Sequence, residues 1–198
     1  MTFWGDRRRR RVGLLGGSFN PAHAGHRHIA ELALRRLRLD QVWLLVSPGN
    51  PLKRRHGMAA LADRLKSAQA IADGRRIVAT TVESALRTRY TVDTLRALRR
   101  HFPRVRFVWL MGADNLVQLP HWHGWLEIVR TTPFAVLPRP NYTLRALAGQ
   151  AAQRFRAARI PANLGPALAD MTPPAWVFLT APLHNASATA IRAAQPET

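Results

Sequence analysis

Short apolar runs alternate with longer amphipathic segments along most of this chain, and the alternation limits the folds that are open to it. Buried strands are predicted at residues 12–15, 41–46, 76–82, 105–111, 134–137 and 176–180. Helices are predicted at residues 26–37, 59–72, 91–100, 122–130 and 142–159, and a loop rich in proline and glycine at 160–174. Strands that alternate with helices in this way pair in parallel through right-handed crossovers. The sequence therefore predicts an α/β fold built on a doubly wound parallel sheet.

Four loops of unusual composition each follow a predicted strand. They are residues 16–26, 47–53, 112–114 and 184–192. In a doubly wound sheet, ligands bind beyond the carboxyl ends of the strands, at the point where the strand order reverses. We therefore expect one site to which all four loops contribute.

The loop at residues 16–26, GGSFNPAHAGH, has the chemistry of a phosphate-binding turn. Gly16 and Gly17 let the backbone turn sharply and approach a ligand without a Cβ in the way. The helix predicted after the turn directs its first N–H groups, with their partial positive charge, back toward it. His23 and His26 stand three residues apart at the start of this helix. A glycine turn or a single histidine is common without any such role, but the combination predicts a site that binds phosphate.

The composition indicates a globular protein with one main domain. Hydrophobic residues make up 47% of the 198 residues, which is enough for a substantial core. Cysteine is absent, so disulfides and thiolate-bound zinc are excluded. No apolar run approaches the roughly 20 residues that span a membrane, and the basic run at 7–11 precedes too few apolar residues for a signal peptide. We expect a cytoplasmic protein in which residues 1–11 are a flexible basic extension and residues 12–198 are a single domain.

The formal net charge of +19 needs an explanation of its own. Lysine occurs only at positions 53 and 66, so 28 of the 30 basic side chains are arginines. A basic surface is typical of nucleic-acid-binding proteins, although a positive field also concentrates anionic substrates, and compositional bias is a third explanation. Because the arginines are scattered over every segment, we favour bias together with an anionic substrate. We do not expect nucleic acid to be the main partner.

The segment SATAIR at residues 187–192 is a second candidate for contact with phosphate. Ser187 and Thr189 are suited to open a helix, because their hydroxyls and the local N–H groups are available there. Arg192 follows within the first turns, and its planar guanidinium fits phosphate oxygens. An ordinary capped surface helix has the same pattern, so this segment alone does not establish a site.

Taken together, the two end segments resemble the signatures of the nucleotidylyltransferase superfamily. Residues 16–26 match its GGxFxPxHxGH element, and residues 187–192 match its SxTxIR element. The resemblance implies a Rossmann-like nucleotidylyltransferase fold.

Three inner segments resemble one family of this superfamily, the bacterial nicotinate-nucleotide adenylyltransferases. They are SPGNPLK at 47–53, RYTVDTL at 89–95, and GADNL followed by LPHWHGW between 112 and 125. Arg89 stands where the family usually has serine. The resemblance covers the chain from about Val12 to Arg192.

The resemblance implies transfer of an adenylyl group from ATP to the 5′-phosphate of nicotinate mononucleotide, a step of NAD biosynthesis. The products are nicotinate adenine dinucleotide and pyrophosphate. A phosphate monoester is already largely a dianion at neutral pH, since its second pKa is about 6. The nucleophile therefore needs no general base, and the reaction depends on in-line positioning and on neutralising charge around the attacked phosphorus.

The resemblance also implies roles for individual residues, which we state as expectations. The residues expected to act in catalysis are His23, His26 and Arg192. Those expected to contact ATP are Gly16, Gly17, Ser18, Phe19, Asp114, Ser187 and Thr189. Those expected to contact nicotinate mononucleotide are Lys53, Tyr90, Thr91 and Trp122. Mg²⁺ is expected to arrive with ATP, held largely by phosphates and water, and we expect no metal ion held by the protein itself.

Several alternatives stay open on the sequence alone. The amide, nicotinamide mononucleotide, differs from the acid by one small group, and phosphopantetheine adenylyltransferases share both end signatures. A nucleic-acid-binding protein on the same fold is the alternative from another class. Relatives usually continue into a further C-terminal helix, so either that helix is missing here or another element or subunit covers the core beneath, and a homo-oligomer is left open.

Overall fold

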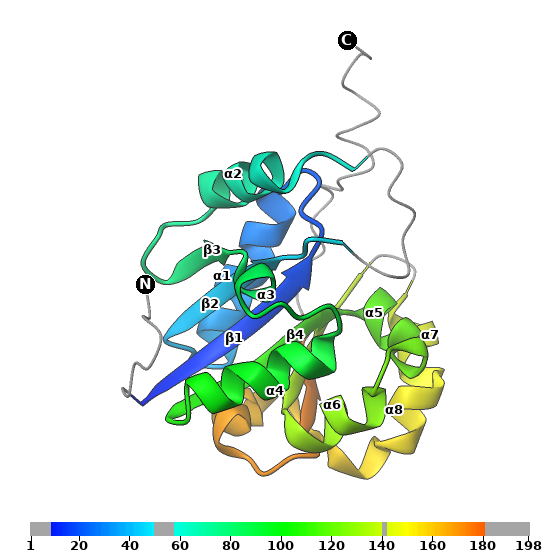
Figure 1. The fold of residues 1–198 in the computed structure, drawn as a ribbon. Coiled ribbons are helices and arrows are strands. Elements are labelled where there is room, and N and C mark those ends of the chain that lie inside the picture. Colours follow the sequence, from blue (N-terminus) through cyan, green and yellow to red (C-terminus); the bar gives the residue numbers. More distant parts are fainter. Residues whose placement is uncertain (1–8, 50–57, 140–141, 181–198) are drawn as a thin grey trace.

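A parallel β-sheet forms the centre of the protein (Figure 1). In this computed structural model, the described residues are 9–49, 58–139 and 142–180. Within them the sheet has seven strands in the order β3-β2-β1-β4-β5-β7-β6, and every neighbouring pair is parallel. The strands are β1 (Arg10–Gly17), β2 (Gln41–Val46), β3 (Ile77–Thr80), β4 (Val105–Gly112), β5 (Phe134–Leu137), β6 (Arg159–Ile160) and β7 (Trp176–Phe178). The predicted doubly wound α/β fold is confirmed.

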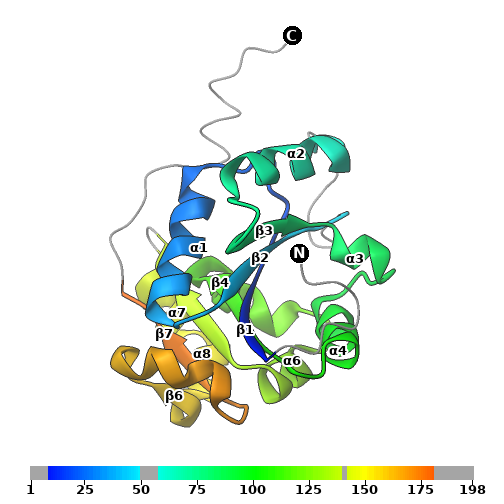
Figure 2. The same cartoon turned by 90° about the vertical axis from the view of Figure 1, so that its left-hand side faces the viewer.

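Helices cover both faces of the sheet (Figures 1 and 2). One face carries α1 (Ala24–Arg36), α2 (Leu61–Ile71) and the 3-10 helix η3 (Ala162–Asp170). The other carries α4 (Thr91–His101), α5 (Ala113–Gln118), α6 (Trp125–Thr131), α7 (Thr143–Ala148) and α8 (Gln150–Arg154). The shorter helices are α3 (Val82–Ala85), η1 (Leu119–His121) and η2 (Arg156–Ala158).

Alternation along the central strands divides the core into two layers. In β4, Phe107 and Trp109 belong to the layer under α4, whereas Val108 and Leu110 belong to the layer under α1. All four are at most 5% exposed. A strand buried on both faces is apolar throughout rather than alternating, which is why this segment is the most hydrophobic run of the sequence.

The strand order reverses between β1 and β4. From β1 the chain crosses over to β2 and β3 on one side, and it returns to β4 and β5 on the other. The loops that leave the carboxyl ends of β1 and β4 therefore diverge and leave a crevice between them, as expected for such sheets. No helix within the described residues is long and apolar enough to cross a bilayer.

The structure corrects the sequence predictions mainly in the last third of the chain. The predicted helix 142–159 is interrupted at Gly149, whose extended backbone (φ −73°, ψ 162°) ends α7 and begins α8. The predicted loop 160–174 contains η3, with Pro166 inside it. The short helices α3 and α5 were not predicted because four to six residues do not establish a helical period. Conversely, β1 begins at Arg10, so two arginines of the predicted extension are paired with β4.

Candidate active site

A cavity of about 460 Å³ lies at the carboxyl edge of the sheet, at the reversal of strand order. The loops after β1 and β2, the start of α4 and the segment from α5 to α6 form its walls. Its lining residues are Gly16, Gly17, Ser18, Ser47, Gly49, Glu83, Arg89, Tyr90, Thr91, Trp109, Asn115, His121, Trp122 and His123. The volume is within the range of small-molecule sites.

The two histidines of the β1–α1 loop are held by backbone hydrogen bonds. His23 is the N-cap of α1, and its Nδ1 accepts from the N–H of Gly25 at 3.1 Å. Nδ1 of His26 accepts from the N–H of His23 at 3.2 Å, and the ring centroids lie 4.0 Å apart. Because Nδ1 is the acceptor in both rings, the proton of each neutral imidazole is assigned to Nε2. Both side chains are therefore fixed as Nε2–H donors.

His26 is neutral at physiological pH. Burial, together with nearby His23 and Arg139, lowers its pKa to about 3. The contribution of Arg139 shows that the loop after β5 approaches this histidine. A negatively charged ligand at Nε2 would raise the pKa again, since an opposite charge favours the protonated form.

Phe19 lies beneath this loop rather than in the cavity. Its ring is 1% exposed and its centroid is 4.9 Å from that of His26. A Cβ at Gly17 would come within 3.2 Å of the Phe19 ring, so the absence of a side chain at position 17 gives this ring its room. The backbone of Phe19, at φ +48°, is left-handed, a conformation that its buried ring holds in place. Only the backbone of Phe19 is therefore available to a ligand.

Asp114 and Arg139 face each other across the carboxyl ends of β4 and β5. Oδ1 of Asp114 and Nε of Arg139 are 3.6 Å apart, and both atoms are buried without a hydrogen-bond partner in the described part of the chain. A Cβ at Gly112 would collide with Asp114 Oδ1, so the glycine makes room for the pair. The two atoms therefore form an ion pair that is too long for a hydrogen bond, while about a third of each side chain remains exposed.

Sequence reasoning did not single out Arg139. Its signal was present, because it follows a predicted strand by two residues and its planar guanidinium suits phosphate.

The other half of the cavity is aromatic. Trp122 meets Trp109 edge-on, with centroids 6.3 Å apart at 84°, and the ring of Tyr90 lies 4.5 Å from that of His123. Nε1 of Trp109 is buried and, among the described residues, has no hydrogen-bond partner. A Cβ at Gly16 would come within 2.7 Å of the Trp109 indole, so this glycine is needed first of all to admit the tryptophan.

The N-terminus of α4 opens into the aromatic half. Tyr90 is the N-cap of α4 and makes no side-chain capping hydrogen bond, and Thr91 is the first helical residue. Both line the cavity. The first N–H groups of a helix have no partner within it and carry partial positive charge, so they suit a carboxylate.

Glu83 is a buried carboxyl group in the wall of the same cavity. It is 9% exposed, and Oγ1 of Thr94 donates to it at 3.4 Å. Burial raises its pKa to about 7, against the opposing effect of hydrogen bonds from Thr94 and Ser47. The charge of this wall therefore changes near neutral pH.

A buried arginine on α2 supports the loops from behind. Arg64 is 3% exposed, and its guanidinium donates to the carbonyls of Ser18 at 2.8 Å and Ser47 at 2.7 Å. It also donates to the Ala59 carbonyl at 3.0 Å. One helical turn later, Ser67 Oγ accepts from the N–H of Ala22 at 3.1 Å. Arg64 thus joins the β1 and β2 loops, a role that sequence reasoning did not detect because an arginine on an amphipathic helix suggests solvent.

The structure brings most of the predicted residues to this edge. Gly16, Gly17, Ser18, Tyr90, Thr91 and Trp122 line the cavity, and His23, His26, Phe19 and Asp114 belong to the loops beside it. Lys53, Ser187, Thr189 and Arg192 lie outside the described residues.

Comparison with protein families gives one match that spans almost the whole chain. Residues 14–194 match the family described as cytidylyltransferase-like. A protein of Gluconacetobacter diazotrophicus is 58% identical over 96% of this chain and 88% of its own length. One from Gluconobacter oxydans is 59% identical over 92% of this chain and 93% of its own. Both carry the name nicotinate-nucleotide adenylyltransferase.

Solved structures agree in fold. The nicotinic acid mononucleotide adenylyltransferase of Plasmodium falciparum, complexed with NaAD, aligns with a TM-score of 0.68 over 93% of this chain and 83% of that one. A Vibrio parahaemolyticus structure aligns with a TM-score of 0.54 over 75% of this chain and 80% of its own. At 14% and 20% identity, these similarities establish the architecture alone.

Proposed function

Because the chain belongs to the cytidylyltransferase-like family, among the bacterial nicotinate-nucleotide adenylyltransferases, we propose that its carboxyl-edge site transfers the adenylyl group of ATP to nicotinate mononucleotide. The products are nicotinate adenine dinucleotide and pyrophosphate. The observation that carries this proposal is the adjacency of two different half-sites. A turn with two Nε2–H donors lies beside an aromatic pocket into which a helix N-terminus opens.

The reaction is an in-line displacement at phosphorus. An oxygen of the 5′-phosphate of nicotinate mononucleotide attacks the α-phosphorus of ATP and forms the new phosphoanhydride. The bond from the α-phosphorus to the oxygen that bridges it to the β-phosphorus breaks, and pyrophosphate leaves with the electron pair. Because the attacking phosphate is already a dianion, the site has to supply orientation and charge stabilisation rather than a base.

His23 and His26 have the geometry for charge stabilisation. Each presents one Nε2–H, and the hydrogen bonds at Nδ1 hold both rings before any ligand arrives. Donors that are oriented in advance cost no reorganisation as charge develops on the α-phosphate oxygens. Arg192, with Ser187 and Thr189, is proposed to hold the departing pyrophosphate.

The adenosine side is assigned to the loops after β1 and β4. Gly16, Gly17, Ser18 and the backbone of Phe19 would lie against the nucleotide, and the partly exposed carboxylate of Asp114 would accept from its ribose.

The aromatic half suits a pyridine ring with a carboxylate. Trp122 would stack on the ring, while the N–H groups of Tyr90 and Thr91 would bind the carboxylate at the start of α4. Lys53 would contribute a flexible positive charge to the phosphate.

Magnesium is proposed as part of the ATP substrate. Among the residues that the structure describes, no three or more His, Asp or Glu side chains group together as metal ligands. Near the proposed triphosphate site the carboxylate is that of Asp114. This donor set fits Mg²⁺ that keeps its waters and is bound through phosphates.

The test is pyrophosphate release from ATP, followed separately with nicotinate mononucleotide, its amide and phosphopantetheine as acceptors. We expect the highest kcat/KM with the acid, because a helix N-terminus favours an anion over a neutral amide. Equal or greater turnover with phosphopantetheine would reassign the acceptor, and salt-dependent affinity for DNA without pyrophosphate release would favour the nucleic-acid alternative.

A further inference from the structure

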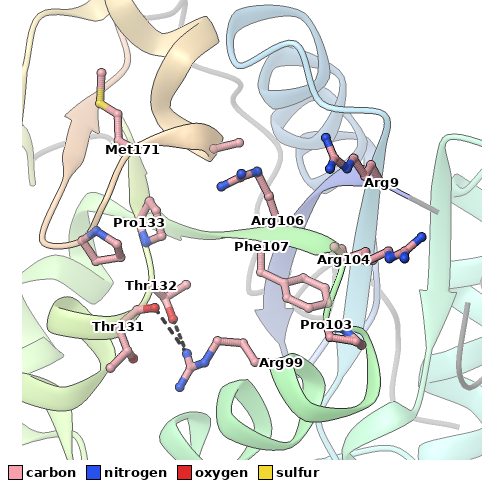
Figure 3. A pocket seen from close by; sticks show the side chains of 13 residues that line it. Arg9, Arg99, Pro103, Arg104, Arg106, Phe107, Thr131, Thr132, Pro133 and Met171 are labelled. Atoms are coloured by element: carbon pink, nitrogen blue, oxygen red, sulfur yellow. Dashed lines mark hydrogen bonds between the residues drawn. The ribbon is translucent and has the colours of Figure 1, made fainter. Parts of the chain in front are cut away.

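A second cavity lies at the amino edge of the sheet, on the opposite side from the carboxyl-edge site. It has a volume of about 560 Å³ and is formed around the amino ends of β4 and β5 (Figure 3). Four arginines line it, Arg9, Arg99, Arg104 and Arg106, together with Thr132 and Phe107. The proposed adenylyl transfer uses none of these residues.

Two segments that the proposed function leaves unexplained meet in this cavity. Arg9 belongs to the arginine-rich N-terminal run, and Met171 and Pro173 belong to the long stretch between β5 and β7. They are more than 150 residues apart in the sequence. The end of η3 is tied to the same place, since Asp170 contacts both Arg11 and Arg106.

The cavity carries a local excess of positive charge. Of its four arginines, Arg106 has a carboxylate partner, Asp170, at 3.2 Å. Arg9 and Arg104 are exposed and make no ion pair within the described residues. Several guanidinium groups that line one cavity with so little compensating charge favour the binding of an anion there.

One of the four arginines is held in place. Nη1 of Arg99 donates to Oγ1 of Thr132 at 2.8 Å, and burial lowers the pKa of its guanidinium, which nevertheless stays charged. Thr132 itself is 1% exposed. Arg99 is therefore an oriented donor at the wall of the cavity, whereas a solvated surface arginine is free to move.

The rest of the lining is mixed: it includes Thr131 and Thr132 as well as apolar residues, and the ring of Phe107 is only 5% exposed. Figure 3 shows Arg9 and Arg106 on one side and Arg99 on the other, with the ring of Phe107 between them. Pro103, Pro133 and Met171 complete the apolar part of the wall. A surface that combines guanidinium donors with hydroxyl groups fits a ligand with several phosphates.

We propose that this cavity binds a compact polyphosphate anion, such as the triphosphate group of a nucleotide, as a site separate from the one at the carboxyl edge. Its volume suits one nucleotide. The limited size favours a small anion over a nucleic-acid strand, which needs a basic groove that continues along the surface.

The experiment is equilibrium dialysis of labelled ATP against the full chain, with the number of bound equivalents as the readout. Arg9→Gln/Arg104→Gln removes two exposed guanidiniums from the cavity. The matched control, Arg75→Gln/Arg145→Gln, removes two exposed arginines that do not line it and lowers the net charge by the same amount. Circular dichroism of each protein establishes that it is folded.

We expect the cavity variant to bind one equivalent fewer than the wild-type chain, with the affinity of the lost site lowered about a hundredfold, or about tenfold per arginine. The control should bind as the wild type does. This difference is expected whether or not the carboxyl-edge site also binds ATP. Unchanged binding in the cavity variant, or an equal loss in both variants, overturns the proposal. Displacement of the bound ATP by a single-stranded oligonucleotide of higher affinity overturns it in favour of a nucleic-acid interface.

Discussion

The two edges of the sheet use polar side chains in opposite ways. At the carboxyl edge His23, Arg64 and Glu83 are buried and hydrogen-bonded, although Arg89, His121 and His123 are exposed, and His26 has a pKa of about 3 and is uncharged. At the amino edge Arg9 and Arg104 are exposed, charged and without ion pairs in the described part of the chain. The comparison suggests that the carboxyl edge recognises its ligands by geometry and the amino edge by charge.

This difference explains why the net charge of +19 is a poor guide to the active site. The arginine that matters most for the shape of the carboxyl edge, Arg64, is buried and bonded to carbonyl oxygens instead of facing substrate. Substitutions at the two edges should therefore have different effects on catalysis and on stability, and effects of different size.

The largest effect is expected for His26→Ala. Loss of a donor that acts in the transition state typically lowers kcat by about 10²- to 10³-fold, while the KM for ATP should change only a few-fold. Steady-state kinetics of pyrophosphate release measures both. The control is His101→Ala, at the end of α4 that lies away from the cavity, and its kcat and KM should be close to those of the wild type. A change confined to KM would show that His26 does not stabilise the transition state.

Arg64→Met should be the most destabilising substitution at the carboxyl edge. It leaves three carbonyl oxygens without their donor, and each buried unsatisfied group costs about 1–3 kcal/mol. We expect a loss of several kcal/mol, measured by urea unfolding. Lys66→Met, an exposed position on the same helix, is the control. Equal stability of the two variants would contradict the role assigned to Arg64.

Glu83→Gln should change how stability depends on pH. The pKa of Glu83 in the folded chain, about 7, lies above its usual value of 4.5, so folding favours the protonated carboxyl. The contribution is fully present below pH 4.5 and is lost as the pH rises through 7. Relative to the variant, the wild type should lose up to about 3 kcal/mol across this range. Parallel stability curves for the two proteins between pH 4.5 and 8 would show that Glu83 is not buried as described.

Gly16→Ala should have a smaller effect, through packing. The added methyl would meet the Trp109 indole at 2.7 Å, and overpacking of this kind costs about 1–3 kcal/mol. Trp109→Phe in the same chain should recover part of that loss, because the smaller ring leaves room. A double-mutant cycle on unfolding free energies measures the coupling, and strict additivity would count against this contact.

The smallest effect is expected at the amino edge. Arg9→Gln/Arg104→Gln should change the unfolding free energy by less than about 0.5 kcal/mol per residue, since both side chains are exposed and unpaired within the described residues. Its kcat for adenylyl transfer should equal that of the wild type. A large loss of stability or of turnover would contradict the claim that the amino edge takes no part in adenylyl transfer or in stabilising the fold.

The sequence predicted the sheet better than the connections. Strands such as β2 and β5 have the predicted ends, because a buried parallel strand is a continuous apolar run between loop signals. The predictions for the segments after β5 were wrong in detail: Gly149 divides a stretch rich in the helix formers Ala, Leu, Gln and Arg, and a 3-10 helix such as η3 has no apolar period of 3.6. Tertiary packing decides such segments, and local patterns do not contain it.

For the candidate site, motifs predicted which loops meet, but not how they are held. The position of His23 follows from strand-end loops that converge at one edge, whereas Tyr90 and Trp122 were placed by the family resemblance. Arg64 and Arg139 were missed, since their roles depend on contacts with residues that lie 17 to 46 positions away along the chain. The raised pKa of Glu83 likewise depends on burial, which a sequence pattern does not specify.

A crystal structure of the full chain with nicotinate adenine dinucleotide tests the central claim most directly. We predict the pyridine ring against Trp122 and the start of α4, the adenosine beside Asp114, and the diphosphate within hydrogen-bond distance of Nε2 of His23 or His26. Product bound only in the amino-edge cavity, or at the carboxyl edge with neither histidine in contact with phosphate, would contradict the account.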